Sequence, residues 1–162
     1  MIFRKLRLIY KNQKGVTLPE LVVALAIVGL IAGITTMVIF QVFTGNISAS
    51  NHMTAVRQVQ NAGYWISHDT QMAQSVVPAA DPDGFPLSLS WTGWYGDTHT
   101  ATYTIKNEEI WRNYDGQRSR VAQYVDSANC EFTDGALVFT VTATVGTQSE
   151  TRVYEVIPRP ST

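Results

Sequence analysis

Ser67, His68 and Asp69 are the residue types of a hydrolytic triad, in which a histidine takes a proton from serine and a carboxylate orients the histidine. They are consecutive, however, within a stretch of helical periodicity, where adjacent side chains point in different directions. His52 and His99 add no paired metal-ligand spacing such as His-Glu-x-x-His, and the sequence has no glycine-rich phosphate loop. We therefore expect neither an enzyme nor a cofactor or metal.

Two further residue groups could bind metal or form a cross-link. Asp81-Pro82-Asp83-Gly84 indicates a turn. Its two carboxylates fall short of the six or more oxygen ligands that calcium takes, so the sequence leaves calcium binding open. Cys130 is the single cysteine, which excludes an intramolecular disulfide and a Cys-rich zinc site. We expect Cys130 to be a small buried residue of a strand.

Glu20 is the titratable residue in the most unusual position. It stands immediately before 23 uncharged residues, from Leu21 to Phe43, which are enough to cross about 30 Å of hydrocarbon as a helix. A carboxylate at this position is costly without a partner, so Glu20 is a candidate functional residue. The alternative is that Glu20 lies in the zone of the lipid headgroups.

The charges are distributed unevenly along the chain. Five of the 12 Lys and Arg residues precede Gly15, whereas all 13 acidic residues follow it. The positive-inside rule then predicts a cytoplasmic N-terminus and an extracytoplasmic domain after Phe43. Since the later part of the chain is acidic overall, we expect no contact with nucleic acid. The five early basic residues are Arg4, Lys5, Arg7, Lys11 and Lys14.

The N-terminus admits three interpretations. A secretory signal peptide has an apolar region of about 7–15 residues followed by a small-residue cleavage site, and neither matches this sequence. A plain signal anchor leaves Glu20 unexplained. The third interpretation is a signal that is cut before the apolar segment, at Gly15, so that the apolar helix stays on the mature protein.

The run Gly15-Val16-Thr17-Leu18-Pro19-Glu20, followed by Leu21-Val22-Val23-Ala24-Leu25-Ala26-Ile27-Val28-Gly29, resembles the class III signal of type IV pilins and type II secretion pseudopilins. The resemblance implies that a prepilin peptidase cuts between Gly15 and Val16 on the cytoplasmic side and methylates Val16. It also implies that Glu20 is the family's glutamate. Val16 departs from the usual Phe at the first mature position, although other apolar residues also occur there.

The residue chemistry is consistent with this resemblance. Val16 and Glu20 are four residues apart, on one side of a helix start. Cleavage would create a positive α-amine at Val16, and pairing with Glu20, in the same or a neighbouring subunit, would recover much of the cost of two charges in an apolar setting. Gly29 and Gly33 form a G-x-x-x-G spacing that permits close helix contact. We expect backbone carbonyls to accept from the hydroxyls of Thr35 and Thr36.

The helical pattern continues beyond the apolar segment. Apolar residues recur at three- and four-residue steps from Ala49 to Val76, and Pro78 ends the pattern. We therefore predict one helix from about Pro19 to Val77. The domain boundaries are a leader (1–15), a membrane and assembly helix (16–43), an amphipathic continuation (44–77) and a β domain (78–162).

The β domain is predicted from period-two alternation. It is expected to form a meander of antiparallel strands with one face on the amphipathic helix, an α+β fold. The strands are expected at 87–91, 101–105, 110–114, 121–125, 130–132, 136–145 and 151–157, with a hairpin turn at Asn107-Glu108. Trp91, Trp94 and Tyr95 form an aromatic loop that either packs over the edge of the core or forms a contact surface.

Three segments bear on the subclass within this family. The segments Trp65–Ala73, Tyr103–Ile105 and Glu109–Arg112 resemble minor pseudopilins of the J type, and a minor pilin of another filament is the competing interpretation. The expected partners are a prepilin peptidase, other pilin or pseudopilin subunits and, before assembly, membrane lipid. A protein of another class, a signal-anchored extracytoplasmic binding domain that never polymerises, remains open.

Overall fold

The computed structural model describes residues 15–160, so the basic leader predicted before Gly15 lies outside the described residues. One helix, α1 (Leu18–Met72), is followed by eight strands, and the α+β class is confirmed. The chain divides after Gly45 into two compact units. The strands are β1 (Ser75–Val77), β2 (Leu87–Thr92), β3 (Thr98–Lys106), β4 (Glu109–Tyr114), β5 (Gln117–Ala122), β6 (Val125–Thr133), β7 (Ala136–Val145) and β8 (Gln148–Val156).

The first unit contains the apolar half of α1. Pro19 lies in the first turn, where its missing N–H removes no helical hydrogen bond. Glu20 places a negative charge near the positive end of the helix dipole. The hydroxyls of Thr35 and Thr36 donate to the carbonyls of Ile31 and Ala32 at 2.8 and 2.9 Å, as the sequence predicts. The hydroxyl groups of these two threonines are thus satisfied within the helix.

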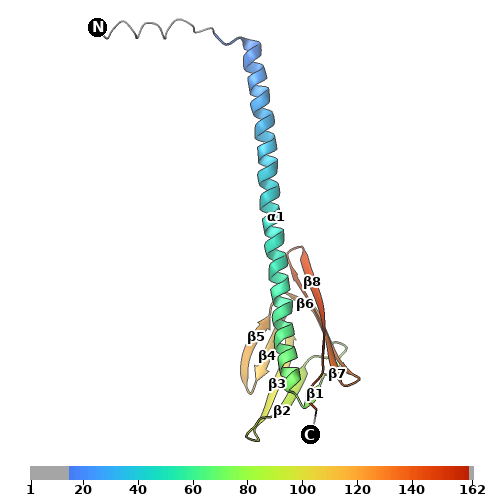
Figure 1. The fold of residues 1–162 in the computed structure, drawn as a ribbon. Helices are drawn as coiled ribbons and strands as arrows, with labels where there is room; N and C mark the ends of the chain where they lie inside the picture. Colours follow the sequence, from blue (N-terminus) through green and yellow to red (C-terminus); the bar gives the residue numbers. More distant parts are fainter. Residues whose placement is uncertain (1–14, 161–162) are drawn as a thin grey trace, which may run out of the picture. The chain divides into compact units, whose positions relative to one another are not determined.

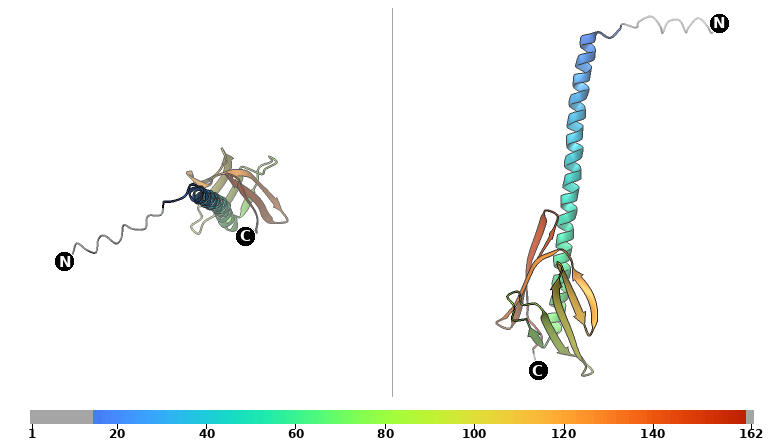
Figure 2. Two further views of the ribbon diagram at one scale, coloured as in Figure 1. Left: turned by 90° about the horizontal axis from the view of Figure 1, so that it is seen from above. Right: turned by 180° about the vertical axis from the view of Figure 1, so that it is seen from behind.

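The second unit packs residues 46–72 of α1 against two antiparallel sheets. The five-stranded sheet has the order β1-β2-β3-β4-β5, and the three-stranded sheet has the order β6-β7-β8. The two sheets flank the green half of α1 on different sides (Figures 1 and 2). The expectation of a single meander is therefore corrected, because the chain leaves the first sheet after β5 and begins the second at β6.

The core lies where the helix meets both sheets. Ala55, Val59, Ala62 and Ile66 are fully buried, which confirms a helical stripe at three- and four-residue steps. Val59, Ala62 and Ile66 pack with apolar side chains that alternate along the strands. The largest fully buried strand residues are Leu87, Leu89, Tyr103, Ile110, Leu137, Phe139 and Val141. Cys130 is buried in β6, as expected.

Tight turns join the neighbouring strands. Asn107 and Glu108 have φ of 53° and 60°, the backbone of a two-residue turn that matches the twist of a hairpin. The hairpin predicted at this position is confirmed as β3–β4, in which Lys106 pairs with Glu109. Asp115-Gly116 turns β4 into β5 with φ of 47° and 87°.

Two predicted boundaries are wrong. The helix ends at Met72 rather than Val77, and Ser75–Val77 forms β1, in which Val76 pairs with Leu89. β-Branched residues before a proline favour extended backbone, and the edge of β2 offers them hydrogen bonds. The predicted strand 121–125 is split, because Ala122 ends β5 and Val125 begins β6, with Tyr124 between them at φ 57°.

Candidate processing and assembly site

The segment from Gly15 to Glu20 is exposed to solvent and leads into the start of α1. Gly15, Val16 and Thr17 are exposed and outside regular structure, and the Leu21 amide donates to the Thr17 carbonyl at 3.1 Å. The Gly15–Val16 bond therefore lies in chain that a protease could engage. Glu20 is exposed, and among residues 15–160 it takes part in none of the ion pairs.

The helix that follows exposes a continuous apolar surface. No residue between Leu21 and Phe43 is buried within the chain, and α1 is long and apolar enough to cross a membrane. An apolar surface of this extent requires lipid or other helices as cover. A Cβ added at Gly29 or Gly33 would meet nothing within 4 Å, so both glycines leave an open notch on the helix.

A buried polar cluster fastens the second half of α1 to the five-stranded sheet. Asp69 is 1% exposed. Arg112 Nε donates to Asp69 Oδ2 at 2.6 Å, and Arg112 Nη2 donates to Oδ1 at 3.0 Å. Tyr103 Oη donates to Oδ2 at 2.5 Å. The guanidinium also lies over the rings of Trp65, at 4.9 Å, and Tyr114, at 4.6 Å. The carboxylate is therefore both charge-paired and fully hydrogen-bonded.

The pKa shifts agree with this geometry. Burial, together with the Asp69 charge, raises the pKa of Tyr103 far above its ordinary value. The hydrogen bond to Asp69 raises the pKa of Arg112, against the smaller effect of burial. In the described part of the chain, no buried side-chain nitrogen or oxygen lacks a hydrogen-bond partner. The arrangement is that of a structural ion pair with a neutral phenol.

The sequence prediction missed this cluster, although a signal was present. Asp69 follows Ala62 and Ile66 at helical spacing, on the same face that the structure buries. A carboxylate on the buried face of a helix needs a cationic partner. Asp69, the acid of the Ser67-His68-Asp69 run, is bound by Arg112 and Tyr103. His68 Nδ1 approaches Asp69 Oδ1 only to 3.4 Å.

The aromatic loop divides into a buried and an exposed part. Trp91 is 7% exposed and stacks on Tyr114 at 5.9 Å. Trp94 and Tyr95 are 96% and 90% exposed at the tip of the β2–β3 turn. Behind the tip, His99 Nδ1 lies 2.7 Å from Asp115 Oδ2. Hydrogen bonds from His99 and from the Thr100 amide lower the pKa of Asp115. Trp91 thus packs over the core, the first of the two expected alternatives, whereas a contact surface formed by Trp94 and Tyr95 stays a prediction.

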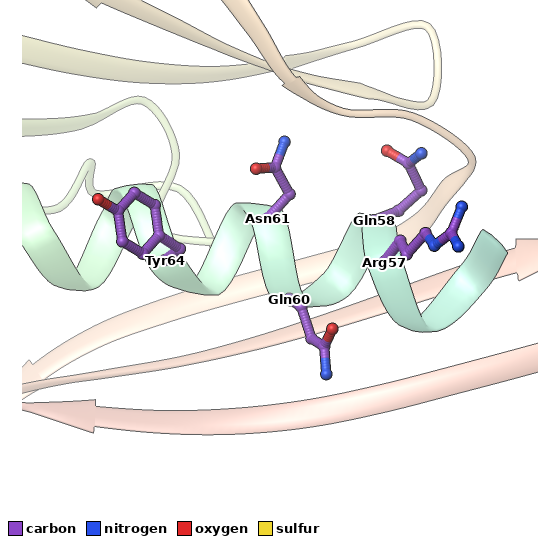
Figure 3. Close-up of a pocket in the computed structure, with 5 residues that line it drawn as sticks. All are labelled: Arg57, Gln58, Gln60, Asn61 and Tyr64. Carbon is purple, nitrogen blue, oxygen red and sulfur yellow. The ribbon is translucent and has the colours of Figure 1, made fainter. Parts of the chain in front are cut away.

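A polar depression of about 410 Å³ lies on α1 and is lined by Arg57, Gln58, Gln60, Asn61 and Tyr64 (Figure 3). Asn61 Nδ2 donates to the Val121 carbonyl at 2.6 Å, and Gln58 Oε1 accepts from the Gln123 amide at 2.9 Å. Two of the polar groups therefore tether the end of β5 to the helix. The lining holds no carboxylate, histidine, serine, threonine or cysteine. Within residues 15–160, no group of three or more His, Cys, Asp or Glu residues could hold a metal.

Comparison with protein families finds one match. The prokaryotic N-terminal methylation motif matches residues 10–36. The matched segment contains Gly15, Val16 and Glu20 together with the notch at Gly29 and Gly33. Comparison with curated proteins gives no match, and comparison with solved structures gives none either. The match supports a prepilin-type signal of the type IV pilin kind, and the J-type subclass stays a prediction.

Proposed function

We propose that the chain is a pilin-like structural subunit of a type IV pilus or type II secretion pseudopilus, cut and N-methylated by a prepilin peptidase. The match of the N-terminal methylation motif to residues 10–36 is the observation that carries the proposal. The exposed apolar helix behind this motif supports it, because lipid before assembly and neighbouring helices after assembly are the two environments that can cover such a surface.

The proposed sequence of events starts in the membrane. The precursor inserts with its basic leader on the cytoplasmic side, and the peptidase cuts the Gly15–Val16 bond. The methylated Val16 amine and the Glu20 carboxylate then form an electrostatic pin, within one subunit or between neighbours. Pairing offsets the cost of holding each charge in an apolar bundle, so the pin favours one axial register. The open notch at Gly29 and Gly33 lets another helix approach closely.

The fold of the second unit supports a structural role outside the membrane. Asp69 and Arg112 join the second half of α1 to the five-stranded sheet, so the second unit is held together by a buried ion pair of its own. We propose that this subunit is a minor one. The second candidate, a signal-anchored domain that does not polymerise, shares the exposed apolar helix but requires no cleavage at Gly15.

N-terminal mass analysis separates the two candidates. The full chain is produced in membranes with and without a co-expressed prepilin peptidase. We expect loss of Met1 to Gly15 and the mass of one added methyl group on Val16 only when the peptidase is present. An intact Met1 in the presence of a peptidase that processes a known prepilin in the same cells would remove the pilin interpretation.

A further inference from the structure

Two adjoining depressions form one elongated groove at the end of α1. The first, of about 620 Å³, lies between the end of α1, the β2–β3 turn and the segment after β8; its lining includes Met72, Trp94 and Arg159. The second, of about 350 Å³, is lined in part by Phe132 and Ile157. Gln74 and Arg159 line both. We refer to the pair as the β1 groove, because β1 forms one wall.

The groove presents apolar side chains on a fixed backbone. Trp94 and Ile157 are 96% and 74% exposed, and Met72 and Phe132 are also exposed. The turn that carries Trp94 is closed by hydrogen bonds from the Gly93 amide to the Asp97 carbonyl (2.7 Å) and from the Gly96 amide to the Gly93 carbonyl (3.1 Å). The backbone that carries Trp94 is thus held in place, and an exposed tryptophan is a residue type enriched among interface anchors.

The backbone beside the groove can accept another strand. β1 is the edge strand of the five-stranded sheet and pairs only with β2. An edge strand carries unpaired N–H and C=O groups that template the addition of an extended chain. The segment on the opposite wall includes Pro158 and Pro160, which have no N–H to donate. An incoming extended segment therefore finds main-chain groups on β1 that pair with no other strand among residues 15–160.

The positive charge of the groove indicates that its ligand carries a negative charge. Arg159 is the one charged side chain in the lining of either depression. A guanidinium between apolar surfaces favours a carboxylate. We propose that the β1 groove binds an extended polypeptide segment of a partner protein, with an apolar side chain against Trp94 and Met72 and a neighbouring carboxylate on Arg159. This site does not depend on cleavage or polymerisation of the chain.

A peptide-display selection tests the proposal. The full chain, in phosphatidylcholine nanodiscs, is immobilised and challenged with a random library of peptides of about twelve residues, a length that exceeds the span of β1. We expect enriched peptides to carry Asp or Glu beside an aliphatic or aromatic residue. Absence of enrichment, or enrichment of basic peptides, would overturn the proposal.

Variants then locate the binding. For a synthetic enriched peptide, Trp94→Ala and Arg159→Glu should each raise Kd by about tenfold, as expected for loss of an anchor. Tyr95→Ala is the matched control, because Tyr95 shares the turn but lines neither depression, and Arg118→Glu controls for charge reversal elsewhere. Both controls should leave Kd within about twofold. Binding that survives the Trp94→Ala/Arg159→Glu double variant would place the peptide elsewhere and overturn the site.

Main-chain recognition has its own test. In an added strand, alternate residues donate their N–H groups to the neighbouring strand. Two peptides are therefore compared, one N-methylated at the odd positions and one at the even positions. We expect about tenfold weaker binding for the one of these two peptides that loses the donating N–H groups. Equal affinity of the two peptides would refute strand addition. A uronic-acid oligosaccharide serves as a second probe. Saturable binding of the sugar that depends on Trp94, without peptide binding, would show a glycan site instead and overturn the proposal.

Discussion

Arg112 donates a hydrogen bond to each carboxylate oxygen of Asp69, with Nε 2.6 Å from Oδ2 and Nη2 3.0 Å from Oδ1. This two-point contact joins the helix to the fourth strand of the sheet across 43 positions of sequence. Both groups are largely removed from water, with side chains 13% and 1% exposed. A pair of this kind fixes orientation as well as contact, because the guanidinium fork fits the carboxylate in one plane.

Removal of Arg112 should destabilise the fold, because it leaves the buried Asp69 carboxylate without a cationic partner. We expect Arg112→Met to lower the free energy of unfolding by about 3 kcal/mol. In the Asp69→Asn/Arg112→Met double variant, the neutral amide still accepts from Tyr103, so the double variant should be more stable than Arg112→Met alone. Urea unfolding of the full chain in detergent, followed by tryptophan fluorescence, measures both. A loss below about 1 kcal/mol for Arg112→Met would mean that the pair behaves as an exposed one.

The buried Tyr103 phenol predicts a loss of stability in alkali. Its pKa is raised by burial and by Asp69, so above about pH 10 the unfolded chain loses this proton while the native state keeps it. The free energy of unfolding should then fall as pH rises, by up to about 1.4 kcal/mol per pH unit from this group. Cys130, whose pKa burial raises to about 12, contributes with the same sign.

Tyr103→Phe should reduce the alkaline slope without abolishing it, because Cys130 is retained. The measurement is the urea midpoint between about pH 9 and pH 11. Tyr95→Phe is the matched control, since its ring is in solvent, and it should keep the wild-type slope. An unchanged slope in Tyr103→Phe would show that the phenol is not held neutral by the fold.

Local patterns predicted much of this fold. The apolar run before Phe43, the stripe through Val59 and Ile66, and the Asn107-Glu108 hairpin all depend on residues close in sequence, and each is confirmed. The methylation motif is equally local, and the family comparison finds it at residues 10–36. These features could be predicted because their determinants lie within a turn or two of one another.

The missed features depend on distant partners. Helical periodicity extends to Val76, but β1 exists because Val76 pairs with Leu89 on β2. The Asp69 cluster requires residues 34 and 43 positions away, which single-sequence patterns do not join. The split into two sheets is decided by where β5 ends and β6 begins, at the positive φ of Tyr124. The spacing of apolar residues in the sequence does not reveal a change of chain direction at one residue such as Tyr124.

Gly63 is predicted to be intolerant of any side chain. It is buried on α1, and an added Cβ would overlap the ring and hydroxyl of Tyr154. That ring cannot move freely, because it stacks on Phe139 at 4.8 Å and donates to the Val59 carbonyl. Gly63→Ala should therefore lose about 1–3 kcal/mol of unfolding free energy, despite the better helix propensity of alanine.

A compensating change tests the cause of the Gly63→Ala effect. Tyr154→Leu removes the overlapping ring, so Gly63→Ala should cost less in a Tyr154→Leu background than in the wild type. Gly45→Ala is the control, since a Cβ there meets nothing within 4 Å and helix propensity alone should act. Additive effects of Gly63→Ala and Tyr154→Leu in urea unfolding would remove the steric explanation.

Glu20 provides the most direct test of assembly. The proposed pin requires a negative charge opposite the new Val16 amine, and cleavage precedes the pin. Glu20→Ala should therefore be cut after Gly15 as efficiently as wild type but enter filaments poorly. Glu20→Gln should behave like Glu20→Ala despite its similar size, because the charge is what is missing. Glu155→Gln, an exposed carboxylate on β8, serves as the control and should assemble normally.

The readouts for Glu20 keep the two steps apart. Mass analysis reports cleavage and methylation, and the amount of subunit in sheared filaments, relative to membranes, reports incorporation. We expect a decrease of about tenfold or more in the filament fraction for Glu20→Gln, since an unpaired amine in an apolar bundle is costly. Normal incorporation of Glu20→Gln would show that the ion pair between the Val16 amine and Glu20 does not set the axial register of the subunits. Failure of cleavage would instead mean that Glu20 is read by the peptidase.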